Sequence, residues 1–180
     1  MSESSDRETP NYQTPNHKTP KPKPTESSSA KSKAAKKDLA VVGWQEWVVL
    51  PSLANSPIRA KIDTGAASSS VHASKVVVAH DPFGREVASF DLHLDEDRTT
   101  TITIPRHHVH DTRVVRSSSG HWSARPVLTV PLQIGNFTFD VDVTLAARDP
   151  MEYRMLIGRS ALRKRFFVDT SQSFLLGEPQ

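Results

Sequence analysis

The chain has 180 residues, a length that fits one domain of ordinary size with a tail. It has no cysteine, which excludes a disulfide framework and a thiolate metal site. Its formal net charge is +3, and no apolar run is long enough for a membrane span or a signal-peptide core. We therefore expect a cytoplasmic location and no membrane partner.

Residues 1–38 differ in composition from the rest of the chain. They hold five of the thirteen prolines and few aliphatic side chains. Such a segment cannot bury enough apolar area to offset its ordering entropy, so we expect a disordered tail with polyproline II bias. The tail carries eight Lys/Arg against five Asp/Glu, whereas residues 39–180 carry fifteen of each. The net charge therefore lies in the Lys-rich tail, where a solubilising linker is favoured over binding to nucleic acid.

Residues 39–180 predict an all-β domain. Apolar and β-branched segments bounded by Pro, Gly or Asp indicate short strands, and Gly135-Asn136 is typical of a hairpin turn. We expect strands at residues 41–42, 47–50, 58–62, 76–78, 87–94, 101–104, 127–134, 137–143 and 155–157. The one expected helix covers residues 160–165. This pattern is typical of closed or partly closed sheets.

The expected strand at residues 58–62 leads directly into Asp63-Thr64-Gly65. An aspartate at the end of a strand is held rigidly and can still turn its carboxylate into a cleft, as a general acid or base must. The same three residues are also ordinary turn formers, so Asp63 as a simple turn cap is the alternative interpretation. A second apolar strand that ends in glycine, residues 155–158, lies far downstream and favours the functional interpretation.

Further motifs extend this pattern over most of the chain. They are Gly43-Trp44, Glu46-Trp47, Leu50-Pro51, residues 60–66 with Ser69, His72 and Ala73, residues 116–121 with Arg125-Pro126, residues 143–145 with Arg148-Asp149, residues 155–159 with Leu162, and residues 167–169. With these motifs, residues 42–173 resemble the retropepsin-like bacterial proteins that have long been labelled ATP-dependent zinc proteases. The resemblance implies a retropepsin-like (acid protease) barrel with one short C-terminal helix, and an aspartic endopeptidase.

The resemblance also implies roles for the loop residues. Asp63 would be the catalytic carboxylate, and the Thr64 hydroxyl would reach across a dimer axis. Gly65 would bring its N–H to the carboxylate, and Ala66 would leave room for substrate. An aspartic peptidase needs two carboxylates that share one proton. Because Asp-Thr-Gly occurs once and the chain is too short for two lobes, we expect a C2 homodimer that pairs two copies of Asp63.

By the same resemblance, Ile157 and Gly158 would support the Asp63 loop from behind, and Arg159 would be structural. In viral retropepsins the corresponding arginine pairs with an acidic residue four positions after the catalytic aspartate. That position is Ala67 in this chain, which leaves the partner of Arg159 open.

A polar, glycine-containing run at residues 116–121 lies between two β-like segments. It is either a flap or substrate-gripping hairpin, in which an arginine recognises a carboxylate, or an ordinary exposed loop. The candidate substrate-binding residues are Arg116, Ser117, Ser118, Gly120, His121 and Arg125.

The histidine-rich run at residues 107–111 is the one candidate for a metal site, because His108 and His110 would share a face of a strand. It has no His-Glu-x-x-His motif and no third ligand at a diagnostic spacing, and His72 stands alone. A Gly-rich phosphate loop ending in Lys-Ser/Thr is also absent from the sequence. We therefore expect no metal and no other cofactor, against both halves of the old family label.

The sequence thus predicts a metal- and ATP-independent aspartic endopeptidase that acts as a homodimer on protein or peptide substrates. Relatives of this kind are often associated with ATP-grasp ligases that append glutamates to proteins, which suggests carboxylate-rich substrates. The rival hypothesis is a non-catalytic module of the same fold that binds a protein partner or a protein tail.

Overall fold

The computed structural model describes residues 39–95, 99–116, 120, 122–147 and 152–178. The chain divides into two units, Met1–Lys36 and Lys37–Gln180, and every described residue belongs to the second. The disordered tail expected at residues 1–38 lies outside the described residues, so that expectation stays a prediction. Within the described ranges, no helix is long and apolar enough to cross a membrane.

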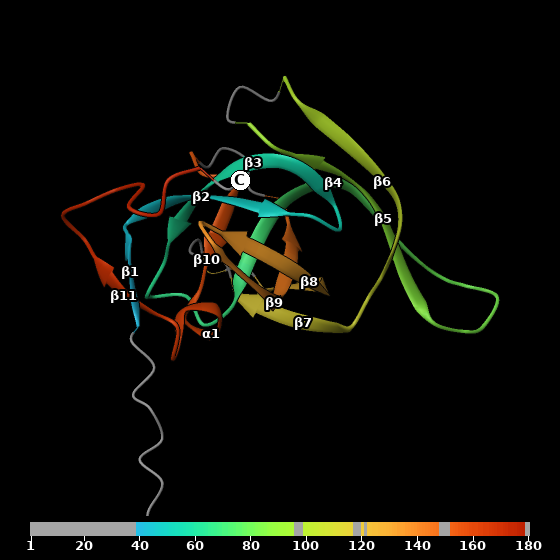
Figure 1. The fold of residues 1–180 in the computed structure, drawn as a ribbon. Helices are drawn as coiled ribbons and strands as arrows, with labels where there is room; N and C mark the ends of the chain where they lie inside the picture. Colours follow the sequence, from blue (N-terminus) through green and yellow to red (C-terminus); the bar gives the residue numbers. More distant parts are fainter. Residues whose placement is uncertain (1–38, 96–98, 117–119, 121, 148–151, 179–180) are drawn as a thin grey trace, which may run out of the picture. The chain divides into compact units, whose positions relative to one another are not determined.

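The described residues form eleven strands and one short helix (Figure 1), which confirms the predicted all-β class. The elements in chain order are β1 (Ala40–Gly43), β2 (Gln45–Leu50), β3 (Ala54–Ile62), β4 (Ser69–His80), β5 (Glu86–His93), β6 (Thr101–His108), β7 (Asp111–Arg116), β8 (Trp122–Ile134), β9 (Phe137–Ala146), β10 (Met155–Ile157), α1 (Arg159–Leu162) and β11 (Phe166–Asp169).

Six of the strands close into a barrel in the order β10-β3-β2-β8-β9-β4, and β4 returns to β10. The short strand β10 makes this closure, because it pairs with β3 in parallel and with β4 in antiparallel orientation. Alternate side chains of these strands point inward and form the apolar core. Core members from the barrel strands include Val48, Leu50, Ile58, Ile62, Val71, Leu128, Leu132, Val143, Met155 and Ile157. The closed barrel expected from the sequence is thereby confirmed.

Beyond the barrel, the outer half of β4 pairs with β5, and β5 pairs with β6. The register of β4 shifts after Ser74, where Lys75 has a left-handed φ of 50° and Nζ lies 2.8 Å from Asp91 Oδ2. Past this bulge β4 is exposed, and in Figure 1 it extends with β5 away from the barrel as a ribbon. Residues 76–78, which predicted a separate strand, are the outer part of the longer β4.

The turn of this ribbon is held by Asp81. Burial alone raises the pKa of the Asp81 carboxyl, but hydrogen bonds from the Arg85 N–H, the Arg85 guanidinium and the Phe83 N–H outweigh it and lower the pKa to about 2. The turn therefore keeps a charged carboxylate at its centre at neutral pH.

The helix is shorter than predicted. The sequence predicts a helix over residues 160–165, but α1 spans only Arg159–Leu162. Arg163 leaves the helical region with ψ 129°, and Lys164 takes a left-handed φ of 63°. The physical reason is that β11 starts at Phe166 and must align in parallel with β1, which requires the chain to turn within three residues.

A buried carboxylate ties the end of the chain to the first two strands. Glu46 is 0% exposed, and its Oε1 accepts hydrogen bonds from Gly43 N at 2.7 Å and Leu175 N at 3.0 Å. Its Oε2 accepts a third from Leu176 N at 3.3 Å. A buried charge is tolerated when hydrogen bonds replace its hydration, and this one fixes the C-terminal segment against β1 and β2.

We predict that Glu46→Gln destabilises the fold by about 1–3 kcal/mol, because the amide keeps one acceptor oxygen and turns an N–H₂ donor toward a backbone N–H that the carboxylate accepted. Urea denaturation of the variant and the parent measures the difference. Glu86→Gln is the control, because Glu86 is exposed at the start of β5 and should change stability little. Equal losses in the two variants would contradict this role for Glu46.

Candidate active site

The loop that carries Asp63 links the end of β3 to the start of β4. Asp63 N donates to Ile157 O at 2.9 Å, which continues the ladder between β3 and β10 for one more residue. Ala66 N donates to Asp63 O at 3.2 Å and closes the turn. The strand thus holds the backbone of Asp63 while its side chain stays half-exposed.

The two carboxylate oxygens of Asp63 differ in their surroundings. Oδ1 accepts hydrogen bonds from Gly65 N at 3.0 Å and Ala66 N at 3.1 Å. Oδ2 accepts none from the described residues. Two backbone donors fix the plane of the carboxylate and leave Oδ2 for a ligand or a water molecule. Asp63 therefore caps its turn, and its role as a catalytic carboxylate stays a prediction.

Gly158 lies directly behind this loop. A Cβ atom at Gly158 would stand 2.5 Å from the backbone C and O of Ser68, a separation that side chains do not adopt. Gly158 N also donates to Ser69 Oγ at 3.2 Å. Ile157 is 1% exposed and belongs to the core. The glycine is needed because the backbone at the end of β10 approaches the backbone of Ser68 too closely for a side chain.

The structure identifies the hydrogen-bond acceptors of Arg159, which the sequence left open. Its Nη1 donates to Thr64 O at 2.9 Å and to Gly65 O at 2.7 Å. Its backbone N donates to Ala66 O at 3.0 Å. Because carbonyl oxygens accept the hydrogen bonds of the Arg159 guanidinium, Arg159 does not need an acidic partner. The alanine at position 67, where viral retropepsins have an acidic residue, therefore does not leave Arg159 without acceptors. Arg159 therefore holds the loop through the carbonyl oxygens of Thr64 and Gly65, and β10 holds it through the Asp63 N–H.

Thr64 and Ala67 face an open cavity of about 620 Å³. Its other walls come from α1 and β11, and they combine the cations Arg159 and Arg163 with the apolar side chains of Leu162, Phe166 and Val168. The cavity therefore adjoins the exposed part of the Asp63 loop.

Of the run at residues 116–121, the structure describes Arg116, which ends β7 and pairs with Trp122 at the start of β8, and Gly120. The Arg116 guanidinium lies 5.9 Å from the Trp122 ring centre, and Trp122 is 67% exposed. Arg116 Nε reaches Gly120 O at 3.4 Å, and Arg125 Nε donates to Ser123 Oγ at 3.0 Å. Ser117, Ser118 and His121 lie outside the described residues. The contacts of Arg116, Trp122 and Arg125 given above do not involve Asp63, so the role of this run in substrate binding stays a prediction.

The histidines form no metal site in the part of the chain that the structure describes, where no three His, Cys, Asp or Glu side chains come together. His107 Nδ1 lies 3.1 Å from His108 O. His72 is 1% exposed and its ring lies 4.5 Å from that of His93.

A family model described as retropepsin-like aspartic endopeptidase RimB matches residues 41–179. The chain belongs to this RimB-like family. The match covers the whole barrel, the Asp63 loop and β11, so the family suggested by the sequence motifs is confirmed. The family name describes an aspartic endopeptidase.

Curated relatives of this RimB-like chain carry another name. A probable alpha-L-glutamate ligase of Shewanella pealeana is 38% identical over 141 residues, which is 77% of this chain and 30% of the relative. Proteins of the same name from Desulfotalea psychrophila and Parasynechococcus marenigrum are 37% and 40% identical, over 77% of this chain. The chain thus spans about 30% of the length of the curated relatives it matches, and their name belongs to much longer proteins.

A solved structure shares the fold. It is a Legionella pneumophila protein of unknown function, 24% identical, with a TM-score of 0.64 over 76% of this chain and 98% of that one. At this identity the similarity supports the barrel and carries no argument about activity.

We predict that Gly158→Ala destabilises the fold by about 1–3 kcal/mol, because the added methyl group overlaps the Ser68 backbone and pushes the loop away from β10. Gly65→Ala is the matched variant, since the nearest atom to its new Cβ is Asp63 Oδ1 at 3.2 Å. It should cost less than about 1 kcal/mol. Urea denaturation compares the two, and a smaller loss in Gly158→Ala than in Gly65→Ala would contradict the packing argument.

Proposed function

We propose that this RimB-like chain is an aspartic endopeptidase that hydrolyses peptide bonds with two copies of Asp63, one from each subunit of a homodimer. The observation that supports the proposal most is the geometry of Asp63, whose Oδ1 is fixed by two backbone N–H groups while Oδ2 stays available. A carboxylate held in this way on a loop braced by β10 and Arg159 has the rigidity that acid–base catalysis needs.

The proposed reaction requires one proton shared by two carboxylates. The ionised Asp63 takes a proton from a bound water as the water oxygen bonds to the scissile carbonyl carbon. The protonated Asp63 of the second subunit gives its proton to the carbonyl oxygen, which forms a neutral tetrahedral gem-diol. Proton transfer to the peptide nitrogen then allows the C–N bond to break, which yields a carboxylic acid and an amine.

The homodimer is part of the proposal because each chain supplies one Asp-Thr-Gly. Thr64 and Gly65 are exposed at the outer end of the loop, where a second copy can approach. The cavity beside Thr64 offers apolar side chains from α1 and β11 on the same side of the loop. A C2 axis at this point would place the two loops against each other.

We also propose that the substrates are protein tails rich in glutamate, and that the reaction takes place in the cytoplasm. The relatives named probable alpha-L-glutamate ligase contain a region similar to this chain within a longer protein, which links the domain to proteins of that name. Arg116 and Arg125 lie on the exposed β7–β8 hairpin, where they are available to carboxylates. The lack of cysteine in the sequence is in keeping with a reducing compartment.

The second candidate is a module of the same fold that binds a protein partner or tail without cleavage. The exposed aromatic ring of Trp122 beside Arg116 favours a binding role, because aromatic and arginine side chains dominate recognition surfaces. The endopeptidase requires an Asp63 side chain that can gain and lose a proton, whereas the binding module does not.

We predict that Asp63→Asn abolishes peptide cleavage and leaves the fold intact, because the amide keeps the size of the side chain but cannot accept and release a proton. The parent should show a bell-shaped pH profile, since activity needs one proton on the pair and falls when that proton leaves or a second is added. Cleavage of a quenched fluorescent peptide across pH measures both. Cleavage by purified Asp63→Asn at the parent rate would exclude the catalytic role and leave the binding module.

We predict that activity per chain depends on protein concentration. Below the dimer dissociation constant the dimer fraction falls in proportion to concentration, so a tenfold dilution should lower specific activity about tenfold. Peptidase assays with sedimentation velocity at the same concentrations test this. A monomer with undiminished specific activity would contradict the shared site.

A further inference from the structure

The outer half of β4, residues 75–80, is an open strand edge. In the part of the chain that the structure describes, it pairs with β5 on one side and with no strand on the other, whereas residues 69–72 of the same strand pair with β9. Every residue from 75 to 80 is exposed, and the exposed fractions of Val76, Val77 and Val78 are 36%, 60% and 42%. Successive apolar side chains on an unpaired edge indicate a surface for another strand.

The backbone groups that face the open edge follow from the pairing of β4 with β5. Asp81 N donates to Arg85 O at 2.9 Å at the end of the ribbon, so the N–H of Asp81 faces the β5 side. Beyond the bulge the register with β5 is regular, and backbone groups along an antiparallel strand face alternate sides. The N–H and C=O groups of Val78 and His80, and the C=O of Val76, therefore point toward the open edge.

The open edge of β4 lacks the protection that the opposite edge of the same sheet has. Sheets protect open edges with prolines, charged side chains or bulges. The edge strand β6 carries Pro105, which has no N–H to donate, and Arg106 follows it. Residues 76–80 contain no proline, lysine, arginine, aspartate or glutamate. The sequence therefore leaves the outer half of β4 able to accept another strand.

The charged side chains around this edge are already paired within the chain. Lys75 Nζ lies 2.8 Å from Asp91 Oδ2, and Arg85 Nη2 lies 2.7 Å from Asp81 Oδ2. Arg106 Nη2 lies 3.5 Å from the same Asp81 oxygen. Each of these cations lies beside a carboxylate of its own chain, so two copies of the ribbon would repel each other little.

We propose that residues 75–80 form an interface between two copies of the chain, in which the outer half of β4 pairs in antiparallel orientation with the same segment of the second copy. A two-fold axis passes between the two copies of Val78, as in an isologous interface. The β4–β5 ribbons of the two copies then join into one continuous sheet. This contact is separate from the dimer of the proposed function and does not depend on it.

The register of the two strands follows from the backbone groups that face the edge. With Val78 opposite the second copy's Val78, each Val78 N–H donates to the Val78 C=O of the other copy. Each His80 N–H then donates to the Val76 C=O of the other copy. This register satisfies the outward donors of both edges, which main-chain pairing requires.

The side chains also match in this register. Val77 lies beside the second copy's Ala79, so apolar side chains meet on one face of the joined sheet. Lys75, at the bulge, lies opposite the second copy's Asp81, at the turn. Opposite charges therefore bound the paired segment at both ends, and no like charges face each other.

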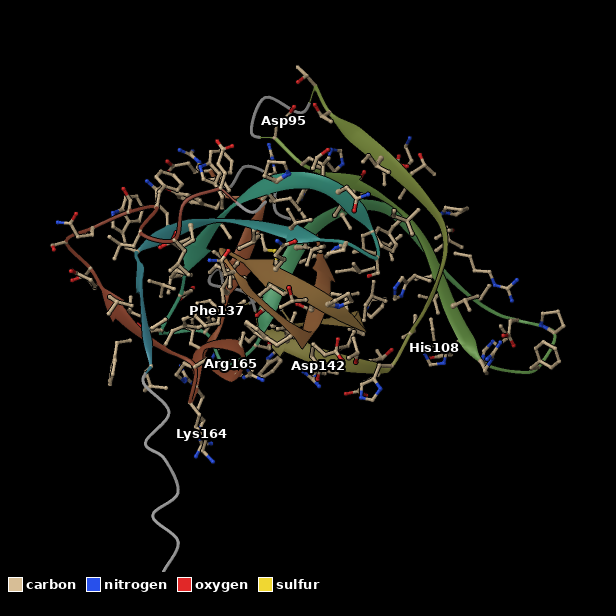
Figure 2. All side chains as sticks on the ribbon, in the orientation of Figure 1. Asp95, His108, Phe137, Asp142, Lys164 and Arg165 are labelled. Carbon is tan, nitrogen blue, oxygen red and sulfur yellow. The ribbon has the colours of Figure 1, made fainter. Side chains whose placement is uncertain are left out.

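The edge lies away from the loop between β3 and β4. Val87 of β5 pairs with Ala79 on one side and with His108 of β6 on the other. Figure 2 shows His108 well separated from Lys164 and Arg165, which follow α1, and α1 begins with a backbone hydrogen bond to that loop. A contact through β4 therefore leaves the loop accessible.

The first experiment uses the absence of cysteine from the sequence. Val78→Cys in the full-length chain places one thiol per chain beside the proposed axis, where paired Cα atoms lie about 5.5 Å apart, a separation that a disulfide spans. Val114→Cys is the matched control, because Val114 is 66% exposed on β7, outside the edge. With diamide as oxidant and non-reducing gel electrophoresis, we expect Val78→Cys to form the covalent dimer about tenfold faster than Val114→Cys.

The second experiment uses charge. Val78→Lys and Val78→Asp each set two like charges against each other at the axis, and each should weaken this association about tenfold. A 1:1 mixture of the two variants sets opposite charges together and should restore the association. Val114→Lys makes the same change outside the edge and should alter association less than about twofold. Sedimentation velocity over a range of concentrations measures all four samples.

The outcomes decide the interface and the peptidase separately. Equal crosslinking of Val78→Cys and Val114→Cys, or a mixture of the charge variants that associates no better than either alone, would overturn the interface. A chain that cleaves no peptide but crosslinks preferentially through Val78→Cys would refute the peptidase and keep the interface. Concentration-dependent cleavage together with equal crosslinking of the two cysteine variants would do the reverse.

Discussion

The double pairing of β10 is the constraint on which both the barrel and the Asp63 loop depend. Three residues, Met155–Ile157, complete ladders with β3 on one side and β4 on the other. The same strand accepts the Asp63 N–H at Ile157 O and places Gly158 against Ser68. The same short strand therefore both closes the sheet and positions the backbone of Asp63. Because Asp63 N is hydrogen-bonded to the strand that closes the barrel, the position of the Asp63 backbone is set by the fold itself.

Much of this arrangement could be predicted from the sequence because it follows from local pattern. The alternation of residues 58–62, the Asp-Thr-Gly turn and the apolar strand ending in Gly158 each have a direct sequence signal. The hairpin at Gly135-Asn136 was predictable for the same reason, and it joins β8 and β9 as expected. The helix length was wrong because its end is decided by the distant pairing of β11 with β1, which no local propensity reports.

Other features depend on contacts between segments far apart in the sequence, and no local sequence pattern predicts these contacts. In the sequence, Glu46 has the pattern of a polar residue in a half-buried strand. Its carboxylate, however, accepts hydrogen bonds from the backbone N–H groups of Leu175 and Leu176, about 130 positions away. The acceptors of Arg159 are backbone carbonyls, which any sequence would supply, so an acidic partner could not be found by searching for one.

Arg159 also bears on how two carboxylates could share one site. Two ionised Asp63 side chains brought together repel each other, and the repulsion grows as water is excluded. Each loop, however, carries its own guanidinium, bound to the carbonyl oxygens of the two residues that follow Asp63. A dimer would therefore join two carboxylates and two cations, so the cluster as a whole would not carry the charge of the acids alone. In the proposed homodimer, the side chain that fixes each loop backbone would also bring positive charge to the paired loops, and pairing the loops is the step that the proposed catalysis requires and a monomeric binding module does not.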